Sequence, residues 1–475
     1  MDHRRHDVAG VAAHHPADNS KNRSIKISDL EIALSAAAAC AGAAGNATPH
    51  ERANWLRAAA DRLEGDRDRL IELARTETRL DHGRLSGELT RTVFQARLFA
   101  DELEAGNLTR ETADPADPDW GPPPRPALTR RWVAIGPVAV FAASNFPFAF
   151  SVFGGDTVSA LAAGCPVVVK AHPGHPELSR AVAREVMSAL TAAGAPQGTL
   201  SLVEGIETGR ALVADPRIKA VGFTGSQAGG RALFDIAVGR ADPIPFYGEL
   251  GATNPVVVTP DGWRDRRHEI VAGFAASFTL SAGQFCTKPG VLFVPGTDDF
   301  VKSMPEVFPG PMLNPQIEER FHDAVTELAA MPGVAQLWQG PETGDGPRAE
   351  LYGLSGADAL ADPSPLMHEC FGPAALLVEY SSLDQLSELL DRLSGTLTAT
   401  IQAGDSDDVA RTCVAPLAAI AGRVIWNQWP TGVAVTHAQQ HGGPWPATTA
   451  PLSTSVGTAA IQRFLRPVAF QNFPF

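Results

Sequence analysis

Apolar side chains recur every three or four positions between about residue 28 and residue 104. Three segments carry this spacing: EIALSAAAACAGAA, ERANWLRAAADRLEGDRDRLIELARTET and ELTRTVFQARLFADELEAG. Because one helical turn takes about 3.6 residues, the spacing gathers the apolar side chains on one face of a helix. The pattern predicts amphipathic helices that pack on the outside of a larger core.

The pattern changes after DPADPDWGPPPRP, residues 114–126, whose prolines exclude a helix or a central strand and indicate a bend or an arm. Short apolar runs that are typical of buried strands follow: WVAIGPVAVFAA, CPVVVKAH, TLSLVEG and AVGFTGS. Helical patterns separate these runs. Alternating strands and helices predict a parallel sheet with helices on both faces.

A second alternating unit starts near Gly248 with LGATNPVVVTP and continues to about Arg423. A chain of 475 residues is too long for one hydrophobic core. The predicted fold class is therefore α/β, with two α/β domains.

Composition narrows the possible partners. The chain has 44% hydrophobic and 19% charged residues, which is ordinary for a globular protein, and a formal net charge of −14. Such a charge gives no attraction to nucleic acid or to an anionic membrane surface. The N-terminus lacks the apolar core of a signal peptide, and the longest apolar runs, such as ALAAGCPVVV, reach about half a membrane span. We expect a cytoplasmic protein without nucleic-acid or membrane partners.

The cysteines and histidines give no metal signal. The five cysteines are odd in number, widely spaced and without a CxxC pair, which predicts free thiols in a reducing compartment. HAQQH, residues 437–441, has the spacing of a zinc helix, but it lacks the glutamate of HExxH and runs into Gly-Gly-Pro. No metal is predicted.

The spacing of residues alone does not decide the role of two local patterns. VGFTGSQAGG, residues 221–230, joins a strand end to a helix start, where backbone amides could meet a pyrophosphate, but an ordinary strand-to-helix turn has the same pattern. Cys286 lies in FTLSAGQFCTKPG among small residues. A single cysteine can be a small buried hydrophobe or, where it is accessible and near a base, a nucleophile.

Five motifs in order carry a family resemblance: ASNFPFAF, FTGSQAGG, GELGATNP, SAGQFCTKPG and ECFGP. Together they resemble the aldehyde dehydrogenase superfamily, and the resemblance covers about residues 28–475. The C-terminal RVIWNQWPTGVAVTHAQQHGGPWPATT is most similar to the α-ketoglutaric semialdehyde (2,5-dioxovalerate) dehydrogenases, with NADP-dependent fatty aldehyde dehydrogenases as close relatives.

The resemblance implies a fold and an assembly. It implies a Rossmann-like cofactor-binding domain, a catalytic α/β domain, an oligomerisation arm, and a homodimer or homotetramer. The expected boundaries are a flexible tail at 1–24, the cofactor domain at 25–112 and 136–246, the catalytic domain at 247–450, and the arm at 113–135 and 455–475.

The same resemblance implies the catalytic roles. Cys286 is expected to attack the aldehyde, and Asn145 to donate to the oxyanion together with the Cys286 backbone amide. Glu249 is expected to be the general base. Without the resemblance, Asn145 would be interpreted as a turn residue and Glu249 as a surface glutamate. The family usually has glycine where this chain has Ala252.

The resemblance also implies that NADP or NAD is bound. The residues expected to line it are Lys170 at the adenosine ribose, Gly225, Ser226 and Gly230 at the pyrophosphate, Glu369 at the nicotinamide ribose and Phe371 near the ring. NAD-preferring relatives often have a glutamate at the position of Pro173, so NADP should be tolerated and even preferred. His172 and His175 lie nearby, and they are interpreted as polar loop residues rather than contacts.

A small aldehyde is the expected substrate, α-ketoglutaric semialdehyde in the first instance. The family register puts Phe146, Ala149 and Phe153 on the tunnel wall with Val435 nearby. Arg91 would lie at the tunnel mouth and pair with a substrate carboxylate, with Arg97 as a weaker candidate. Two alternatives remain: an aliphatic aldehyde as substrate, with Arg91 a solvated helix residue, and a cysteine hydrolase or acyltransferase without redox chemistry. A non-catalytic relative would be indicated by loss of Cys286, Asn145 or Glu249.

Overall fold

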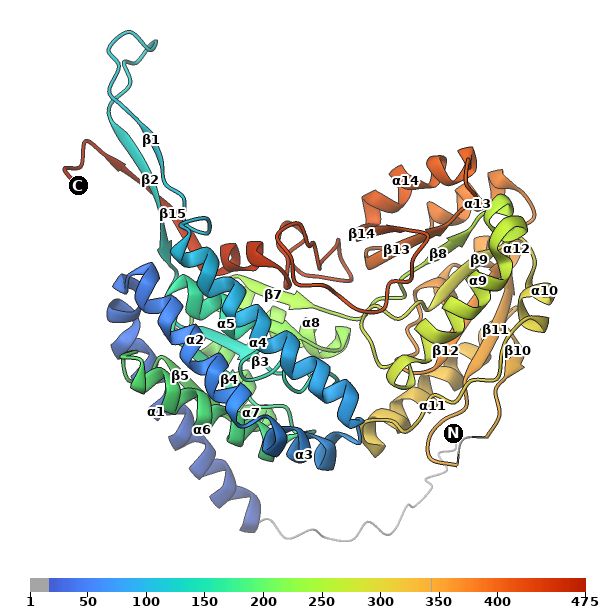
Figure 1. Ribbon diagram of the computed structural model, residues 1–475, viewed down its shortest axis with the longest axis horizontal. Coiled ribbons are helices and arrows are strands. Elements are labelled where there is room, and N and C mark those ends of the chain that lie inside the picture. The colour runs from blue at the N-terminus through green and yellow to red at the C-terminus, as the bar shows by residue number, and fades with distance from the viewer. Residues whose placement is uncertain (1–16, 343) are drawn as a thin grey trace, which may run out of the picture.

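The computed structural model describes residues 17–342 and 344–475, and side chains from residue 29 onward. It has two lobes and a long arm that projects from the first lobe (Figure 1). The predicted tail, residues 1–24, lies mostly outside the described residues, but helix α1 (Ala17–Asn46) begins within it. No helix among the described residues has the length and apolar character needed to cross a membrane.

The first lobe contains a parallel five-stranded sheet in the order β5-β4-β3-β6-β7. Its strands are β3 (Val138–Phe141), β4 (Val167–Lys170), β5 (Leu200–Val203), β6 (Ala220–Thr224) and β7 (Phe246–Glu249). The helices of this lobe, besides α1, are α2 (Pro49–Gly65), α3 (Arg67–Thr78), α4 (His82–Glu104), α5 (Gly155–Ala163), α6 (Pro176–Ala192), α7 (Ile206–Ala214) and α8 (Gln227–Val238). The strand order reverses at β3, and in such sheets ligands bind beyond the carboxyl ends of the strands at the reversal.

The second lobe contains a seven-stranded sheet in the order β10-β11-β12-β9-β8-β13-β14, parallel except for the β10–β11 pair. Its strands are β8 (Val256–Val258), β9 (Val291–Val294), β10 (Ala335–Gln339), β11 (Glu350–Ser355), β12 (Ala374–Glu379), β13 (Thr396–Gln402) and β14 (Ala421–Trp426). Its helices are α9 (Pro260–Thr279), α10 (Thr297–Lys302), α11 (Pro315–Ala329), α12 (Gly356–Ala361), α13 (Leu383–Leu390) and α14 (Asp408–Ile420), with short 3₁₀ helices at Leu280–Gly283 and Ser364–Met367.

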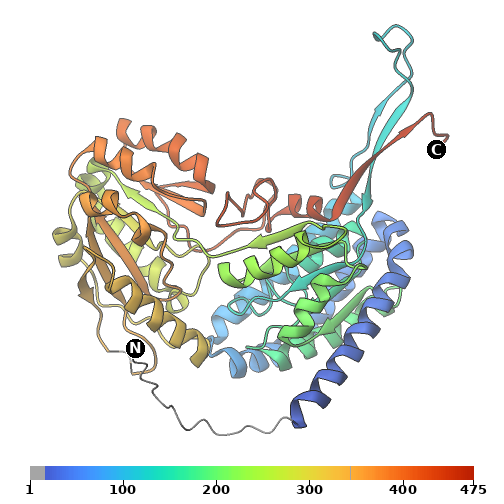
Figure 2. The ribbon, with the colours of Figure 1, turned by 180° about the vertical axis from the view of Figure 1, so that it is seen from behind.

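The arm is a three-stranded antiparallel sheet of β1 (Thr112–Asp114), β2 (Leu128–Ala134) and β15 (Leu465–Gln471). A 3₁₀ helix, Thr458–Phe464, leads into β15. The strand after the proline-rich break therefore pairs with a strand at the C-terminus, as the sequence predicted. Figure 2 shows both strands leaving the first lobe together.

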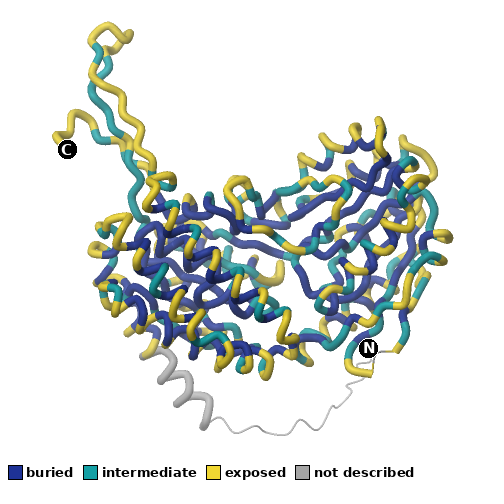
Figure 3. The backbone as a smooth tube through the Cα atoms, in the orientation of Figure 1, coloured by how far each residue is buried: buried dark blue, intermediate teal, exposed yellow. Residues whose placement is uncertain are grey.

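Periodicity correctly predicted the α/β class, because helices pack against the sheets of both lobes (Figure 1) and the central strands of those sheets are buried (Figure 3). The sequence pattern located the boundaries of helices and domains less well. The segment ERANWLRAAADRLEGDRDRLIELARTET forms two helices, since α2 ends at Gly65 and α3 begins after Asp66. The expected domain boundary between residues 246 and 247 falls inside β7, which pairs with β6 through Glu249.

Candidate active site

Two cavities meet at Cys286. The larger, about 590 Å³, lies beyond the carboxyl ends of β3, β4, β6 and β7 and also touches α11 of the second lobe. The smaller, about 340 Å³, lies between α4 and the loops around residues 146 and 432. Cys286 lines both, so a ligand in either cavity reaches its sulfur.

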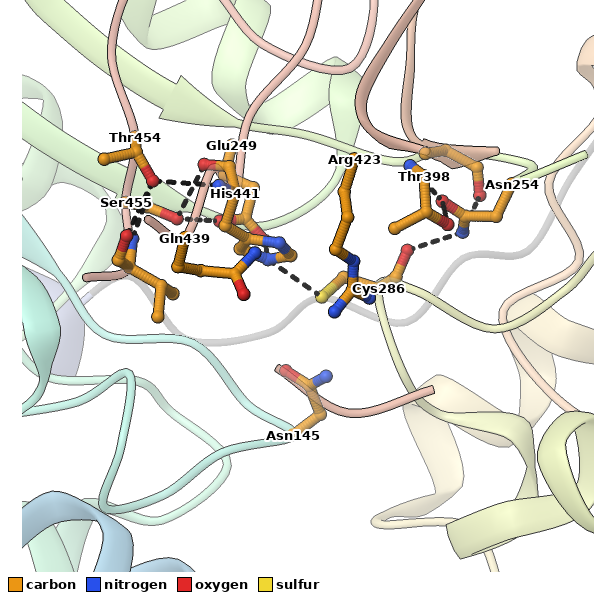
Figure 4. A network of polar contacts seen from close by, with 12 residues as sticks. Asn145, Glu249, Asn254, Cys286, Thr398, Arg423, Gln439, His441, Thr454 and Ser455 are labelled. Atoms are coloured by element: carbon orange, nitrogen blue, oxygen red, sulfur yellow. Dashed lines mark hydrogen bonds and ion pairs between the residues drawn. The ribbon is translucent and has the colours of Figure 1, made fainter. Parts of the chain in front are cut away.

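Cys286 lies in the turn between the 3₁₀ helix and β9. The side chain of Asn254 holds this turn, because its Nδ2 donates to the carbonyls of Cys286 at 2.8 Å and Lys288 at 3.0 Å. Burial, followed by the Glu249 carboxylate, raises the pKa of the Cys286 thiol well above its ordinary value. The guanidinium of Arg423, which extends toward Cys286 in Figure 4, acts in the opposite direction. The thiol therefore keeps its proton until a base takes it.

A buried carboxylate and a buried imidazole lie beside the thiol. His441 Nε2 is 2.9 Å from Glu249 Oε1 and 3.6 Å from Cys286 Sγ, and Ser455 Oγ donates to Glu249 Oε2 at 2.5 Å (Figure 4). Burial raises the pKa of Glu249, but His441, Ser455 and Cys286 together outweigh it, and the pKa ends below its ordinary value. Glu249 is thus a carboxylate that can accept a proton.

The position of the imidazole proton follows from its neighbours. His441 Nδ1 is buried and has no hydrogen-bond partner among the described residues, whereas Nε2 faces a carboxylate oxygen. A carboxylate only accepts, so we assign the proton to Nε2. His441 then donates toward both Glu249 and the Cys286 sulfur. It can stabilise whichever of the two carries the negative charge.

His441 is the site residue that the sequence reasoning missed. It was considered only as part of a zinc pattern, and nothing in its local sequence points to a partner 192 positions away. The donor atoms of Glu249, Cys286 and His441 lie within 4.8 Å of one another, a spacing compatible with a metal ion. Within this group, His441 donates from Nε2 to Glu249 Oε1 at 2.9 Å.

Asn145 lines the larger cavity together with Cys286. Its Nδ2 donates to the carbonyl of Gln284 at 3.0 Å, two residues before the cysteine. The loop is held from α4, because the buried carboxylate of Glu88 accepts from the amides of Phe148 at 2.8 Å and Ala149 at 2.9 Å. The side-chain amide is therefore kept near the sulfur.

Two residues expected on the tunnel wall lie elsewhere. Phe146 lines the smaller cavity, but Ala149 and Phe153 are each 1% exposed and do not line it; Phe153 belongs to the core of the first lobe. Residues 144–154 form consecutive turns rather than a helix, so helical spacing did not apply. Phe150 faces the cavity in their place. Likewise Val433 lines the cavity, while Val435 is buried beside it.

Arg91 lines the smaller cavity. Its Nε donates to the carbonyl of Val433 at 3.3 Å, while Nη1 and Nη2 are buried and have no hydrogen-bond partner among the described residues. Burial lowers the pKa of this guanidinium, as expected for a cation that lacks a close counter-ion. Arg97, on the exposed face of the same helix, pairs with Asp61 at 2.7 Å. Arg91 is thus a buried cation in the same cavity as Cys286, with two terminal nitrogens that have no hydrogen-bond partner among the described residues.

The larger cavity has the features of a dinucleotide site. Its volume falls within the range of about 300–1,000 Å³ typical of ligand pockets, and Gly225, Ser226 and Gly229 line it at the N-terminus of α8. Gly230, expected at the pyrophosphate, does not line the cavity. A Cβ there would overlap the Leu250 side chain, so this glycine permits close packing of α8 instead.

Other predicted cofactor residues are distributed along the same cavity: Lys170, Glu369 and Phe371 all line it. His172 lines it too, but burial lowers its pKa to about 3, so it is neutral. His175 is buried, with Nε2 2.9 Å from the carbonyl of Ala143, which is a structural role. The cavity's additional cations are Arg210 and Arg320.

Comparison with known proteins identifies the family and the fold. The model of the aldehyde dehydrogenase family matches residues 11–444. An α-ketoglutaric semialdehyde dehydrogenase 2 of Azospirillum brasilense is 45% identical over 436 residues, which are 89% of this chain and 83% of the relative. An α-ketoglutaric semialdehyde dehydrogenase of Acinetobacter baylyi is 41% identical over 435 residues, 90% of this chain and 83% of the relative.

Solved structures share the fold. A bifunctional proline utilization A protein aligns with a TM-score of 0.79 and 23% identity over 93% of this chain, which spans only 45% of that protein. An NAD-dependent aldehyde dehydrogenase of Sinorhizobium meliloti aligns with a TM-score of 0.78 and 21% identity. The alignment covers 94% of this chain and 88% of that protein. A 3,6-anhydro-L-galactose dehydrogenase, solved with a bound nicotinamide dinucleotide, aligns with a TM-score of 0.76 and 22% identity. The alignment covers 93% of this chain and 91% of that protein.

Proposed function

The chain belongs to the aldehyde dehydrogenase family, and from that premise we propose that it oxidises α-ketoglutaric semialdehyde to 2-oxoglutarate. It is an enzyme that converts an aldehyde to the corresponding acid with a nicotinamide cofactor. The choice of substrate rests on Arg91, whose two free guanidinium nitrogens point to a substrate that carries a carboxylate. The names of the two relatives above support the same choice.

The residues around Cys286 support the following sequence of steps. Glu249 takes the proton of Cys286, and the thiolate attacks the aldehyde carbon. The carbonyl oxygen becomes an oxyanion that Asn145 and the Cys286 backbone amide stabilise, a contribution of about 3 kcal/mol for one preorganised donor. An oxidised nicotinamide, which Lys170, Ser226 and Glu369 would hold in the larger cavity, would supply the acceptor for the hydride on the former aldehyde carbon. Loss of that hydride would leave a thioester on Cys286.

Water then hydrolyses the thioester. Glu249 first releases to solvent the proton that it took from Cys286. It then takes a proton from the water as the water attacks the thioester carbon, the C–S bond breaks, and the Cys286 thiolate leaves and regains a proton from Glu249. Since His441 donates from Nε2 to both groups, it can hold Glu249 in place and then stabilise the departing thiolate. The overall result is one carboxylate product and a regenerated enzyme.

NADP is the proposed cofactor. A 2′-phosphate needs a site without a carboxylate and with cations, and the cavity has Pro173, Lys170 and Arg210 in this region. Arg210 is exposed and forms no salt bridge with the described residues, so it is free to pair with a phosphate. The neutral His172 would add no charge.

We further propose a cytoplasmic homodimer or homotetramer. All five cysteines are unpaired, which is typical of a reducing compartment. The arm exposes Phe473 and Phe475, each 58% exposed, and the edge strand β14 exposes Val424 and Trp426. Apolar groups and unpaired strand edges of this kind favour pairing with a second copy.

The test of the substrate is a comparison of kcat/KM for α-ketoglutaric semialdehyde and for pentanal, which has the same chain length without the keto acid, at saturating NADP⁺. We expect the keto acid to be preferred by at least about tenfold, or about 1.4 kcal/mol. A preference for pentanal would reject this proposal. It would favour the aliphatic alternative, which the rings of Phe146, Phe150 and Phe285 on the cavity wall would suit.

A further inference from the structure

Lys288 is a buried cation two positions after the nucleophile. The residue is 4% exposed, and its Nζ donates to the carbonyl oxygens of Cys370 at 2.8 Å and Ala374 at 2.5 Å. It forms no salt bridge with any described carboxylate within 4.0 Å. Burying an ammonium that contacts only carbonyl groups costs desolvation free energy. We therefore expect Lys288 to have a specific role at this position.

Both contacts of Lys288 fall on one loop. Cys370 and Ala374 flank the segment Phe371–Pro373, which connects the Glu369 position to the start of β12. The loop is also packed against the nucleophile's turn, since a Cβ at Gly283 would overlap the carbonyl of Gly372. Lys288 therefore ties the turn that carries Cys286 to the loop that carries Glu369 and Phe371.

Glu369 lies between two cavities. On one side it lines the larger cavity, and on the other it shares a cavity of about 10 Å³ with Lys288. The backbone of Gly251 lies so close that a Cβ there would overlap Glu369 Oε2. The carboxylate is thus confined between a glycine and the region of the ammonium, with its outer face toward the cofactor cavity.

The charge of Lys288 acts on this carboxylate. Burial raises the pKa of Glu369 to about 7, and the Lys288 charge, followed by the Ala252 backbone amide, opposes that increase. The influence is mutual, because Glu369 is among the groups that oppose the burial-driven lowering of the Lys288 pKa. Lys288 is not among the groups that shift the pKa of Cys286.

We propose that Lys288 is a positioning residue for the cofactor: its ammonium fixes the loop of Glu369 and Phe371 and supplies the positive charge that acts on the Glu369 carboxylate. The inference rests on the proposed role of Glu369 at the nicotinamide ribose and goes beyond it by assigning what holds that carboxylate in place. An ionised, fixed Glu369 accepts hydrogen bonds from two ribose hydroxyls better than a mobile or protonated one.

The experiment compares cofactor binding with thiol reactivity in the full-length enzyme. The variants are Lys288→Met, Glu369→Gln and the double variant, with Lys302→Met as the control, since Lys302 is an exposed lysine at the end of α10 in the same lobe. The dissociation constant of NADP⁺ is measured by calorimetry without substrate. The rate of Cys286 alkylation by iodoacetamide is measured without cofactor.

We expect Lys288→Met to weaken NADP⁺ binding at least tenfold and to raise the KM for NADP⁺ in the same proportion, with the alkylation rate within twofold of wild type. The double variant should bind NADP⁺ no more weakly than the weaker single variant, because both changes remove the same contact. A merely structural role would lower the active fraction and kcat but leave the KM for NADP⁺ unchanged.

Three results are decisive. If NADP⁺ binding is unchanged in Lys288→Met but weakened in Glu369→Gln, the inference about Lys288 is wrong and the proposed role of Glu369 stands. Unchanged binding in Glu369→Gln overturns the assigned role of Glu369 on which it rests. If Lys288→Met does not fold, Lys288→Gln keeps amide donors for the two carbonyls and removes only the charge; wild-type NADP⁺ binding in that variant would overturn the electrostatic part.

Discussion

The Nε2 atom of His441 lies 2.9 Å from Oε1 of Glu249, and both side chains are almost completely buried, at 0% and 3% exposed. The bond holds the carboxylate toward the cysteine sulfur and lowers its pKa. A general base that is ionised below neutral pH is ready to take a proton over the whole physiological range, although it is a weaker base for that reason.

Replacing His441 with phenylalanine should slow the reaction and change its pH dependence. Without the donor, the pKa of Glu249 rises, because burial is then less strongly opposed. Glu249 acts only when ionised, so the acidic limb of the profile of kcat/KM against pH should move to higher pH. A lost hydrogen bond to a charged group is worth about 1.5–3 kcal/mol, or about one to two pH units. The measurement is kcat/KM from pH 5 to 9.

A matched control is His437→Phe, since His437 is mostly exposed and lies 3.8 Å from Glu102 rather than near the thiol. This variant should keep the wild-type profile. An acidic limb that stays in place in His441→Phe, even with a lower kcat, would show that His441 does not act on Glu249.

Arg91→Met should selectively lower kcat/KM for the carboxylated substrate. Losing the hydrogen bonds of a charged guanidinium should cost about 1.5–3 kcal/mol, or about 10- to 150-fold in kcat/KM for α-ketoglutaric semialdehyde. The value for pentanal should change by less than about threefold, since this aldehyde has no group that pairs with the cation. Arg97→Met is the control, because Arg97 is exposed on the same helix and binds Asp61. Equal losses for both aldehydes would contradict a carboxylate-binding role.

Arg210→Ala should reduce discrimination between cofactors. We expect kcat/KM for NADP⁺ to fall at least about tenfold, in line with a charge-assisted hydrogen bond to phosphate, while the value for NAD⁺ stays nearly constant. Pro173→Glu should act in the same direction by placing a negative charge near the phosphate. If the wild-type enzyme already prefers NAD⁺ and Arg210→Ala leaves that ratio unchanged, the proposal of NADP is wrong.

Arg463→Met should destabilise the fold where the arm joins the first lobe. Arg463 pairs with Asp156 of α5 at 2.7 Å, and their side chains are 2% and 9% exposed. Removing one partner of a buried pair leaves the other charge uncompensated, at a cost of about 3–5 kcal/mol. Urea denaturation would measure this loss in the free energy of unfolding. The exposed pair Arg231–Asp235 gives the control, since Arg231→Met should cost less than about 1 kcal/mol. Adding Asp156→Asn to Arg463→Met should restore part of the loss, and a failure to do so would argue against an electrostatic cause.

Motifs predicted the central chemistry because each motif is continuous in the sequence. Glu249 ends β7 and Asn145 follows β3, whereas Cys286 lies in the turn before β9, and all three line the same cavity. His441 could not be found in this way. It lies on an irregular C-terminal segment, and only folding brings it to β7.

The errors in detail have one cause. Phe153 and Gly230 were assigned to cavities from the family resemblance, and both face inward. The direction of a side chain in a turn, or at the start of a helix, depends on backbone angles that spacing does not specify. Phe150 and Gly229 occupy the expected positions instead.

By itself, the sequence determined the α/β class and the order of the elements, and its motifs pointed to Cys286 as the proposed nucleophile, since periodic burial and continuous motifs are local properties of the chain. Only the tertiary structure decided which charges meet: His441 with Glu249, Lys288 with the loop of Glu369, and Arg91 with two terminal nitrogens that have no hydrogen-bond partner among the described residues. These relationships depend on distances of a few ångströms between segments far apart in the chain. Such distances are set by how helices and sheets pack, which no local pattern records.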